Sequence, residues 1–241
     1  MGKIVYSYGY ALRQYKEFKD KEKKYNLKLQ QGKYYVIRFD GKGMTKAFKI
    51  KKQSINTKFF RTMKYTFNEF CKANNNILFA YSFSDEISIL IYGNSKVDDM
   101  NRIEKLLSLM SCKLALLFYK YAKKNQLDLK NEDWLFDARI IELEKQEVIN
   151  YFISRQAFAI DKYIMQLRSE HNIGQELNNS QKVIDKLRNL GINYDALPKE
   201  YRYGLIYSSS NQVETFEFYE NKELLKDLCD LIDKNISAEG A

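Results

Sequence analysis

Residues 77–93, ILFAYSFSDEISILIYG, contain two apolar runs that are separated by the polar residues Ser84, Asp85 and Glu86. Apolar runs of this length are typical of β-strands, and a short polar interruption between them is typical of a hairpin turn. The sequence therefore predicts a β-hairpin over residues 77–92, with Ser84-Asp85-Glu86 as its turn. Two adjacent carboxylates in a turn are either solvated turn residues or part of a functional site, and the rest of the chain has to distinguish these alternatives.

The segments around the hairpin predict a mixed fold. A β-prone run at 34–39 (YYVIRF) ends in Asp40-Gly41-Lys42-Gly43, and LFDARIIEL at 135–143 is a further expected strand. Apolar residues at helical spacing predict one helix from about 55 to 74 and another from about 99. The order of strand, helix, hairpin, helix and strand predicts an α+β fold with a ferredoxin-like βαββαβ core.

The domain organisation follows from this core. We expect an N-terminal arm over 1–30, the core over 31–145, and a mostly helical C-terminal region over 146–241 that packs on the core. In the last of these segments, residues 213–219 are strand-like, and a final helix is expected from about 222. The chain has one proline, Pro198, and no Ser-rich or Gly-rich linker marks a boundary.

Composition narrows the class of protein. The chain has 40 Lys and Arg against 31 Asp and Glu, a net charge of +9 that favours polyanionic partners, nucleic acid above all. Its three cysteines are far apart and have no clustered histidines beside them, which argues against disulfides and zinc and favours a cytoplasmic location. We expect no membrane association, because no apolar run approaches the length of a membrane span, and the N-terminus lacks the order of a secretion signal.

The predicted topology brings two acidic residues together. In a ferredoxin-like core the first strand lies beside the hairpin, so Asp40 at its end approaches the turn that bears Asp85. Two carboxylates at the end of an antiparallel sheet suit hard divalent cations, usually Mg²⁺. Two such ions can activate an attacking hydroxyl and stabilise a leaving pyrophosphate, as in the palm of polymerases and nucleotidyl cyclases. The glycines of Asp40-Gly41-Lys42-Gly43 would let backbone N–H groups approach a triphosphate.

Several segments together resemble a known family. YYVIRFDGKGMTKAF, ILFAYSFSDEISIL, NRIEKLLS, LFDARIIEL and KLRNLGINYDALPKEYRYG are similar, in this order, to the tRNA-His guanylyltransferase family. The similarity extends from about residue 12 to residue 204. It is greatest to the bacterial-type guanylyltransferase-like proteins, which are 3′-to-5′ polymerases.

The resemblance implies a palm-like enzyme that adds nucleotides to the 5′ end of tRNA. It implies that Asp40, the Gly41 carbonyl and Asp85 hold two Mg²⁺ ions, and that Glu86 is a supporting catalytic carboxylate. It assigns nucleotide binding to a larger set, which comprises Asp40, Gly41, Lys42, Gly43, Met44, Thr45, Ser84, Asp85, Arg102 and Lys105. Arg155, Gln156 and Lys162 would contact RNA. The implied substrates are GTP, ATP and other nucleoside triphosphates together with tRNA, and the implied assembly is a homotetramer.

The chain departs from the family pattern at several positions. Met44-Thr45 replace Phe-His after the Asp-Gly loop, and the triphosphate-binding lysine before the first helix is missing, although Lys51 and Lys52 are close by. Phe158 and Lys162 replace an Asp and an Asn. Neither side chain discriminates bases as Asn does, which favours template-dependent repair of tRNA 5′ ends over obligatory guanosine addition to tRNA-His. Phe158 would either stack on RNA or belong to the core.

Three classes of function remain open. The first is 3′-to-5′ nucleotide addition to tRNA, either template-dependent or guanosine-specific. The second is a palm-domain nucleotidyl cyclase or signal-nucleotide synthase, against which the basic charge and the long C-terminal region argue. The third is an RNA-binding protein without activity, against which the intact Asp40 and Asp85 argue.

Overall fold

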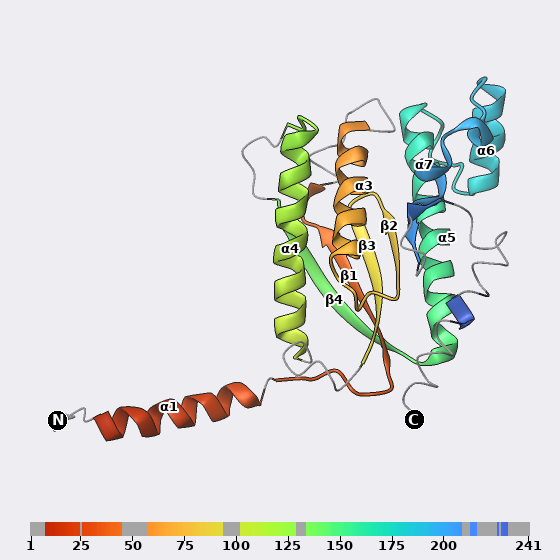
Figure 1. The fold of residues 1–241 in the computed structure, drawn as a ribbon. Helices are drawn as coiled ribbons and strands as arrows, with labels where there is room; N and C mark the ends of the chain where they lie inside the picture. Colours follow the sequence, from red (N-terminus) through yellow and green to blue (C-terminus); the bar gives the residue numbers. More distant parts are fainter. Residues whose placement is uncertain are drawn as a thin grey trace.

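The computed structural model describes residues 8–24, 26–44, 57–93, 102–128, 134–208, 213–215, 226 and 228–230. This part of the chain contains both helices and strands (Figure 1). In chain order they are α1 (Tyr8–Lys23), β1 (Tyr34–Gly41), α3 (Thr57–Lys72), β2 (Phe79–Phe83), β3 (Glu86–Tyr92), α4 (Ile103–Lys124), β4 (Phe136–Leu143), α5 (Lys145–Glu170), α6 (Ser180–Asn189), the 3₁₀ turn η1 (Tyr194–Ala196), α7 (Lys199–Tyr203), β5 (Leu205–Tyr207) and β6 (Val213–Glu214).

The strands form one sheet in the order β4-β1-β3-β2-β5-β6, in which every neighbouring pair is antiparallel. The first four strands have the ferredoxin-like order, with β1 between β4 and β3. The predicted α+β class and βαββαβ core are therefore confirmed. The C-terminal region returns to the sheet, because β5 pairs with β2 at Ala80–Ser82.

Helices cover both faces of the sheet. Successive side chains of a strand point to opposite faces, so each strand contributes side chains to both layers. From β1, Ile37 and Phe39 pack into a cluster with α3 and α4. Tyr34 and Val36, on the other face, pack into a second cluster with α5. Figure 1 shows α3 and α4 side by side on one side of the sheet and α5 on the other. Both layers of helix are held by apolar burial, which is the main driving force for folding.

Most predicted elements match the structure. The hairpin forms as β2 and β3. The helix expected from about 55 to 74 forms as α3, which ends two residues earlier than predicted, at Lys72; residues 55 and 56 lie outside the described residues. The turn is shorter than predicted: only Ser84 and Asp85 form it, because Glu86 already pairs with Phe83 as the first residue of β3. Of the expected strand at 213–219, the structure describes β6 and residue 215 only; most of the final helix also falls outside the described residues.

The N-terminal arm contains a helix, α1, which projects away from the rest of the molecule (Figure 1). From Leu12 to Lys23 its residues are exposed, except for Gln14, which is intermediate. Among the residues that the structure describes, none of the helices combines the length and apolar character needed to span a membrane.

Candidate active site

Asp40 and Asp85 meet at one end of the sheet. Asp40 is the penultimate residue of β1, and Asp85 lies in the turn between β2 and β3. The backbone N–H of Gly41 donates a hydrogen bond to the Asp85 carbonyl, 3.0 Å away, which fixes the end of β1 against this turn. The topology predicted from the sequence therefore does bring these two residues together.

Gly41 is required for this close approach. A Cβ atom at this position would lie 2.5 Å from the Met44 Sδ and 3.0 Å from the Asp85 Cβ, and both distances are shorter than ordinary packing allows. Asp85 is 4% exposed and the Met44 side chain is fully buried. Because Met44 is fully buried in the core, its side chain is not available for the nucleotide contact that the resemblance implies.

The loop after β1 is exposed, and both this loop and the hairpin turn contain a residue with a positive φ. Lys42 and Gly43 are exposed, and Gly43 has a φ of 72°, which glycine adopts without steric cost. Ser84 has a φ of 55°, which is uncommon for a residue with a Cβ and is often found near functional sites. Thr45, expected in the same nucleotide-binding set, lies outside the described residues.

Three carboxylates form a row across the sheet at this end. Asp40 is paired in register with Glu86 of β3 and with Asp137 of β4. Burial raises the pKa of Asp40, and the negative charges of Asp85, Asp137 and Glu86 raise this pKa further, while Lys162 opposes the shift. A cation placed beside Asp40 would therefore be favoured by the surrounding charge.

The oxygen ligands at this end of the sheet suit a Mg²⁺ ion that is completed by substrate phosphates. Among the described residues, no group of three or more His, Cys, Asp or Glu side chains converges tightly enough to hold a metal ion alone. Mg²⁺ is commonly held by one or two carboxylates, with water and substrate phosphates as its other ligands. Asp40, Asp85 and the backbone carbonyl of Gly41, the residue that follows Asp40, fit that pattern.

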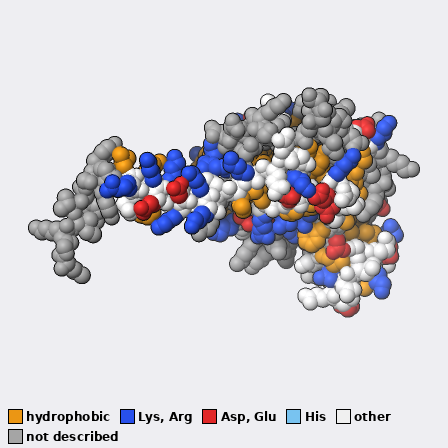
Figure 2. Space-filling view, turned by 90° about the horizontal axis from the view of Figure 1, so that it is seen from below, with side chains coloured by type: hydrophobic (Ala, Val, Ile, Leu, Met, Phe, Trp, Pro, Cys, Tyr) orange, Lys and Arg blue, Asp and Glu red, His pale blue; other side chains and the backbone are white. Residues whose placement is uncertain are grey.

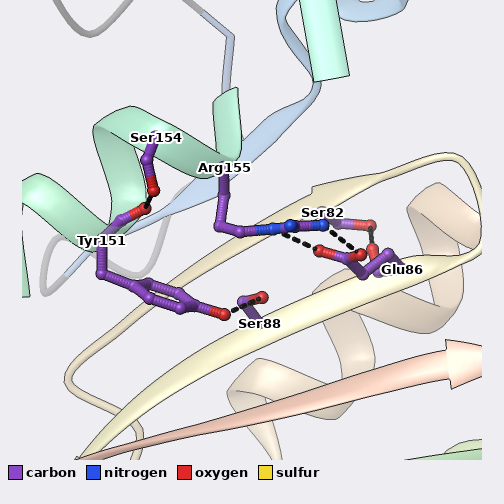
Figure 3. A network of polar contacts seen from close by, with 6 residues as sticks. All are labelled: Ser82, Glu86, Ser88, Tyr151, Ser154 and Arg155. Atoms are coloured by element: carbon purple, nitrogen blue, oxygen red, sulfur yellow. Dashed lines mark hydrogen bonds and ion pairs between the residues drawn. The ribbon is translucent and has the colours of Figure 1, made fainter. Parts of the chain in front are cut away.

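Glu86 has a different environment from its neighbours in the row. The Nε and Nη2 atoms of Arg155 on α5 donate hydrogen bonds to its two carboxylate oxygens, at 3.0 Å and 2.5 Å (Figure 3). The pair is largely buried, with side chains 19% and 21% exposed. A second contact between α5 and β3 lies beside it, where Tyr151 and Ser88 share a hydrogen bond of 3.3 Å (Figure 3). Glu86 therefore connects the sheet to α5.

The three residues of α5 that were expected to contact RNA differ in how exposed their side chains are. Gln156 is 1% exposed, and its side-chain amide donates to the Tyr203 carbonyl at 3.0 Å. The expected RNA contact of Gln156 is thus inconsistent with its burial, and the side chain instead ties α5 to the end of α7. Arg155 is held by Glu86, whereas Lys162 is exposed and close enough to Asp40 to influence its pKa.

Arg102 and Lys105 lie at the other end of the sheet from Asp40. Arg102 forms an isolated bridge with Lys28, which precedes β1, and α4 starts directly after it. Because a strand rises about 3.3 Å per residue, the six steps from Tyr34 to Asp40 alone span about 20 Å. Figure 1 shows the first turn of α4 at the opposite end from the tip of β1. Within one chain, the structure does not bring these two cations to the carboxylates.

Sequence reasoning gave no role to three charged residues of this surface. Asp137 completes the carboxylate row, and behind it Arg38 and Arg139 are also paired in register between β1 and β4. Arg139 forms an ion pair with Asp137 at 3.2 Å. The spacing of Asp137 and Arg139 places both on one face of β4. That these residues lie next to Asp40 depends on strand register, which the sequence does not reveal.

Comparison with known proteins shows a family to which the sequence is similar. The sequence profile of the tRNAHis guanylyltransferase family matches residues 15–144. An uncharacterized protein, R259, of Acanthamoeba polyphaga mimivirus is 24% identical over an alignment of 219 positions, which covers 77% of this chain and 73% of the relative.

Solved structures share the fold. A bacterial tRNA(His) guanylyltransferase-like protein in complex with ATP is 23% identical, with a TM-score of 0.75 over 90% of this chain and 98% of the other. A structure of such a bacterial protein in complex with GTP has a TM-score of 0.70 at 20% identity, over 90% and 99% of the two chains. The tRNA(His) guanylyltransferase of Saccharomyces cerevisiae has a TM-score of 0.67 at 18% identity, over 82% and 93%. The family profile covers more than half of the chain, and the chain therefore belongs to the tRNAHis guanylyltransferase family of nucleotidyltransferases.

Proposed function

We propose that this protein adds nucleotides to the 5′ end of tRNA in the 3′-to-5′ direction, and that it does so as template-dependent repair. The observation that carries the proposal is the meeting of Asp40 and Asp85 at the end of the sheet, in a chain of this family. Membership of a nucleotidyltransferase family favours this reaction over a cyclase and over an inactive RNA-binding protein.

The carboxylates would act through bound metal. Asp40, Asp85 and the Gly41 carbonyl would hold two Mg²⁺ ions, which supply activation of the attacking hydroxyl and neutralisation of the leaving pyrophosphate. The exposed Lys42 and Gly43 would contact the phosphates of the incoming nucleotide through a side-chain charge and a backbone N–H. Structures of similar bacterial proteins in complex with ATP and with GTP support nucleoside triphosphates as substrates.

Two exposed residues on α5 support template dependence. Lys162 offers a point charge that suits phosphate, and Phe158 offers a ring that stacks without selecting among bases. Neither reads a base edge by paired hydrogen bonds. Selection of the nucleotide would then come from Watson–Crick pairing with the opposite strand of the tRNA. The homotetramer implied by the resemblance stays a prediction, which light scattering of the purified protein can check.

Incubation of the protein with Mg²⁺, labelled nucleoside triphosphates and a tRNA that lacks its first nucleotide tests the reaction. Asp40→Asn and Asp85→Asn should each abolish addition, because each removes a carboxylate ligand. Asp185→Asn, on the exposed surface of α6, is the matched control and should keep full activity. Persistent addition by both active-site variants would refute the assignment of these carboxylates.

A competition between tRNAs tests the specificity. Several tRNAs that lack their first nucleotide are mixed and supplied with all four triphosphates. Template-dependent repair predicts that each receives the nucleotide complementary to its opposite strand. Strict addition of G to tRNA-His, whatever base is opposite, would show that the protein is a guanosine-specific enzyme, as the name of its family suggests.

A further inference from the structure

Phe158 is an exposed aromatic residue on α5, the helix that contacts Glu86 through Arg155. Its side chain is 54% exposed, whereas the neighbouring α5 residues Gln156 and Ala159 are buried. This exposure excludes the alternative that Phe158 is a core residue. A single exposed Phe is common on protein surfaces, so its significance depends on what surrounds it.

The ring of Phe158 is held by a second planar group. The guanidinium carbon of Arg155 lies 5.0 Å from the centre of the ring, which is a cation–π contact. The same guanidinium is fixed at its other edge by two hydrogen bonds to Glu86. Arg155 thus has little freedom, and the ring rests against a rigid neighbour. A pre-organised aromatic surface of this kind loses little conformational entropy when it binds a ligand.

This arrangement lies beside the candidate active site. Glu86 is the register partner of Asp40, and directly opposed residues in neighbouring strands have their Cβ atoms about 5 Å apart. Lys162 follows Phe158 by one helical turn and is the cation that acts on Asp40. A small hollow in the surface is lined by Phe83, Glu86, Arg155, Phe158 and Lys162, among others.

We propose that Phe158, positioned by Arg155 and Glu86, is a stacking platform for a nucleobase at the reacting end of the substrate. This inference rests on the proposed function. Lys162 would contact the adjoining phosphate, which agrees with its charge and with its place beside Phe158 in the same hollow. Base stacking on aromatic side chains tolerates every base, because each base has a π-face. The platform would therefore hold the end of the RNA without restricting which tRNA is repaired.

The fluorescence of 2-aminopurine, which falls when this base stacks, tests the proposal. In one arm the fluorophore is the 5′-terminal base of a truncated tRNA, and in the other it is the base of a ribonucleoside triphosphate. Neither arm requires turnover. Wild-type protein should quench the fluorescence in the arm that contains the true occupant. Phe158→Ala should lose this quenching and weaken binding of that ligand about 5- to 150-fold. Phe158→Tyr should retain both.

The matched control is Tyr119→Ala on α4. Tyr119 is 47% exposed and has Lys123 4.6 Å over its ring, a similar cation–π pair, but α4 covers the other face of the sheet. This variant should bind and quench like the wild type. Wild-type behaviour of Phe158→Ala in both arms would overturn the platform, even if nucleotide addition is normal. Failure of the wild type to add nucleotides would instead refute the proposed function, and the quenching result would still identify what Phe158 contacts.

Discussion

Glu86 and Asp40 face each other across two strands, yet their surroundings give them different roles. Glu86 accepts two hydrogen bonds from Arg155, so its charge is already neutralised by the protein. Asp40 lies among like charges that raise its pKa. The resemblance predicted Glu86 as a supporting carboxylate, and its contacts are consistent with support through Arg155. Of the two, Asp40 is the residue whose charge calls for a bound cation.

The raised pKa of Asp40 predicts a pH-dependent effect on stability in the absence of metal. The folded protein holds this proton more tightly than the unfolded chain, so the free energy of unfolding falls as pH rises through the folded pKa. Asp40→Asn lacks this penalty and should be more stable than the wild type at pH 7 in EDTA. The difference should shrink as the pH approaches about 4, the ordinary pKa of Asp.

Urea unfolding of both proteins at several pH values measures this difference. The cause of the shift is burial first and the charges of Asp85, Asp137 and Glu86 next. If Asp40→Asn were less stable than the wild type at neutral pH in EDTA, the like-charge interpretation of the site would be wrong.

The Glu86–Arg155 pair should contribute measurably to stability. Glu86→Gln would leave a largely buried guanidinium with a weaker partner, and we expect a loss of about 1–3 kcal/mol in the free energy of unfolding. Arg155→Lys should also be destabilising, because an ammonium group cannot reproduce both hydrogen bonds of the planar guanidinium. Chemical denaturation measures both variants. Asp185→Asn, which removes an exposed ion pair with Arg188, should cost less than about 1 kcal/mol. Equal effects for the buried and exposed pairs would contradict this prediction.

At the scale of the element, the end of β1 has two glycines with different requirements. Gly41→Ala should destabilise the fold by about 1–3 kcal/mol, because the new Cβ would overlap the Met44 and Asp85 side chains. It should also reduce nucleotide addition, since the Cβ would displace Asp85 from β1. Thermal unfolding and the addition assay, applied to the same sample, measure the two effects.

Gly43→Ala is the comparison for this variant. Nothing lies within 4 Å of a Cβ at position 43, so its cost comes from the positive φ alone and should be about 1 kcal/mol. A Gly41 variant that was as stable and as active as the wild type would show that the turn can shift to accept a side chain.

At the scale of the whole molecule, the charge predicts salt-dependent RNA binding. Figure 2 shows Lys and Arg side chains along α1 and on the adjoining surface of the body. A net charge of +9 on the chain should attract phosphates and release their counterions. We expect tRNA affinity to fall steeply between 50 mM and 200 mM salt, as measured by titration. A flat response would mean that the basic surface is not where tRNA binds.

Sequence periodicity determined the types and order of the core elements. The 3.6-residue spacing of apolar side chains identified α3 and most of α4, and apolar runs identified β1 to β4. Given the ferredoxin-like order, the meeting of Asp40 and Asp85 followed from topology alone. These features could be predicted because they depend on the local pattern of apolar and polar residues, which reports the face that each element must bury.

Only the tertiary structure decided which side chains share an environment. The pairing of Glu86 with Arg155 joins residues 69 positions apart, and the placement of Asp137 beside Asp40 depends on the register between β4 and β1. Gln156 and Phe158 are two residues apart on one helix, yet one is buried against Tyr203 and the other is exposed. Arg102 and Lys105 fall at the far end of the sheet because α4 starts beside Lys28, which precedes β1. Each of these outcomes depends on which distant segments pack against one another, and the local sequence pattern reports only the face that an element buries, not its partners.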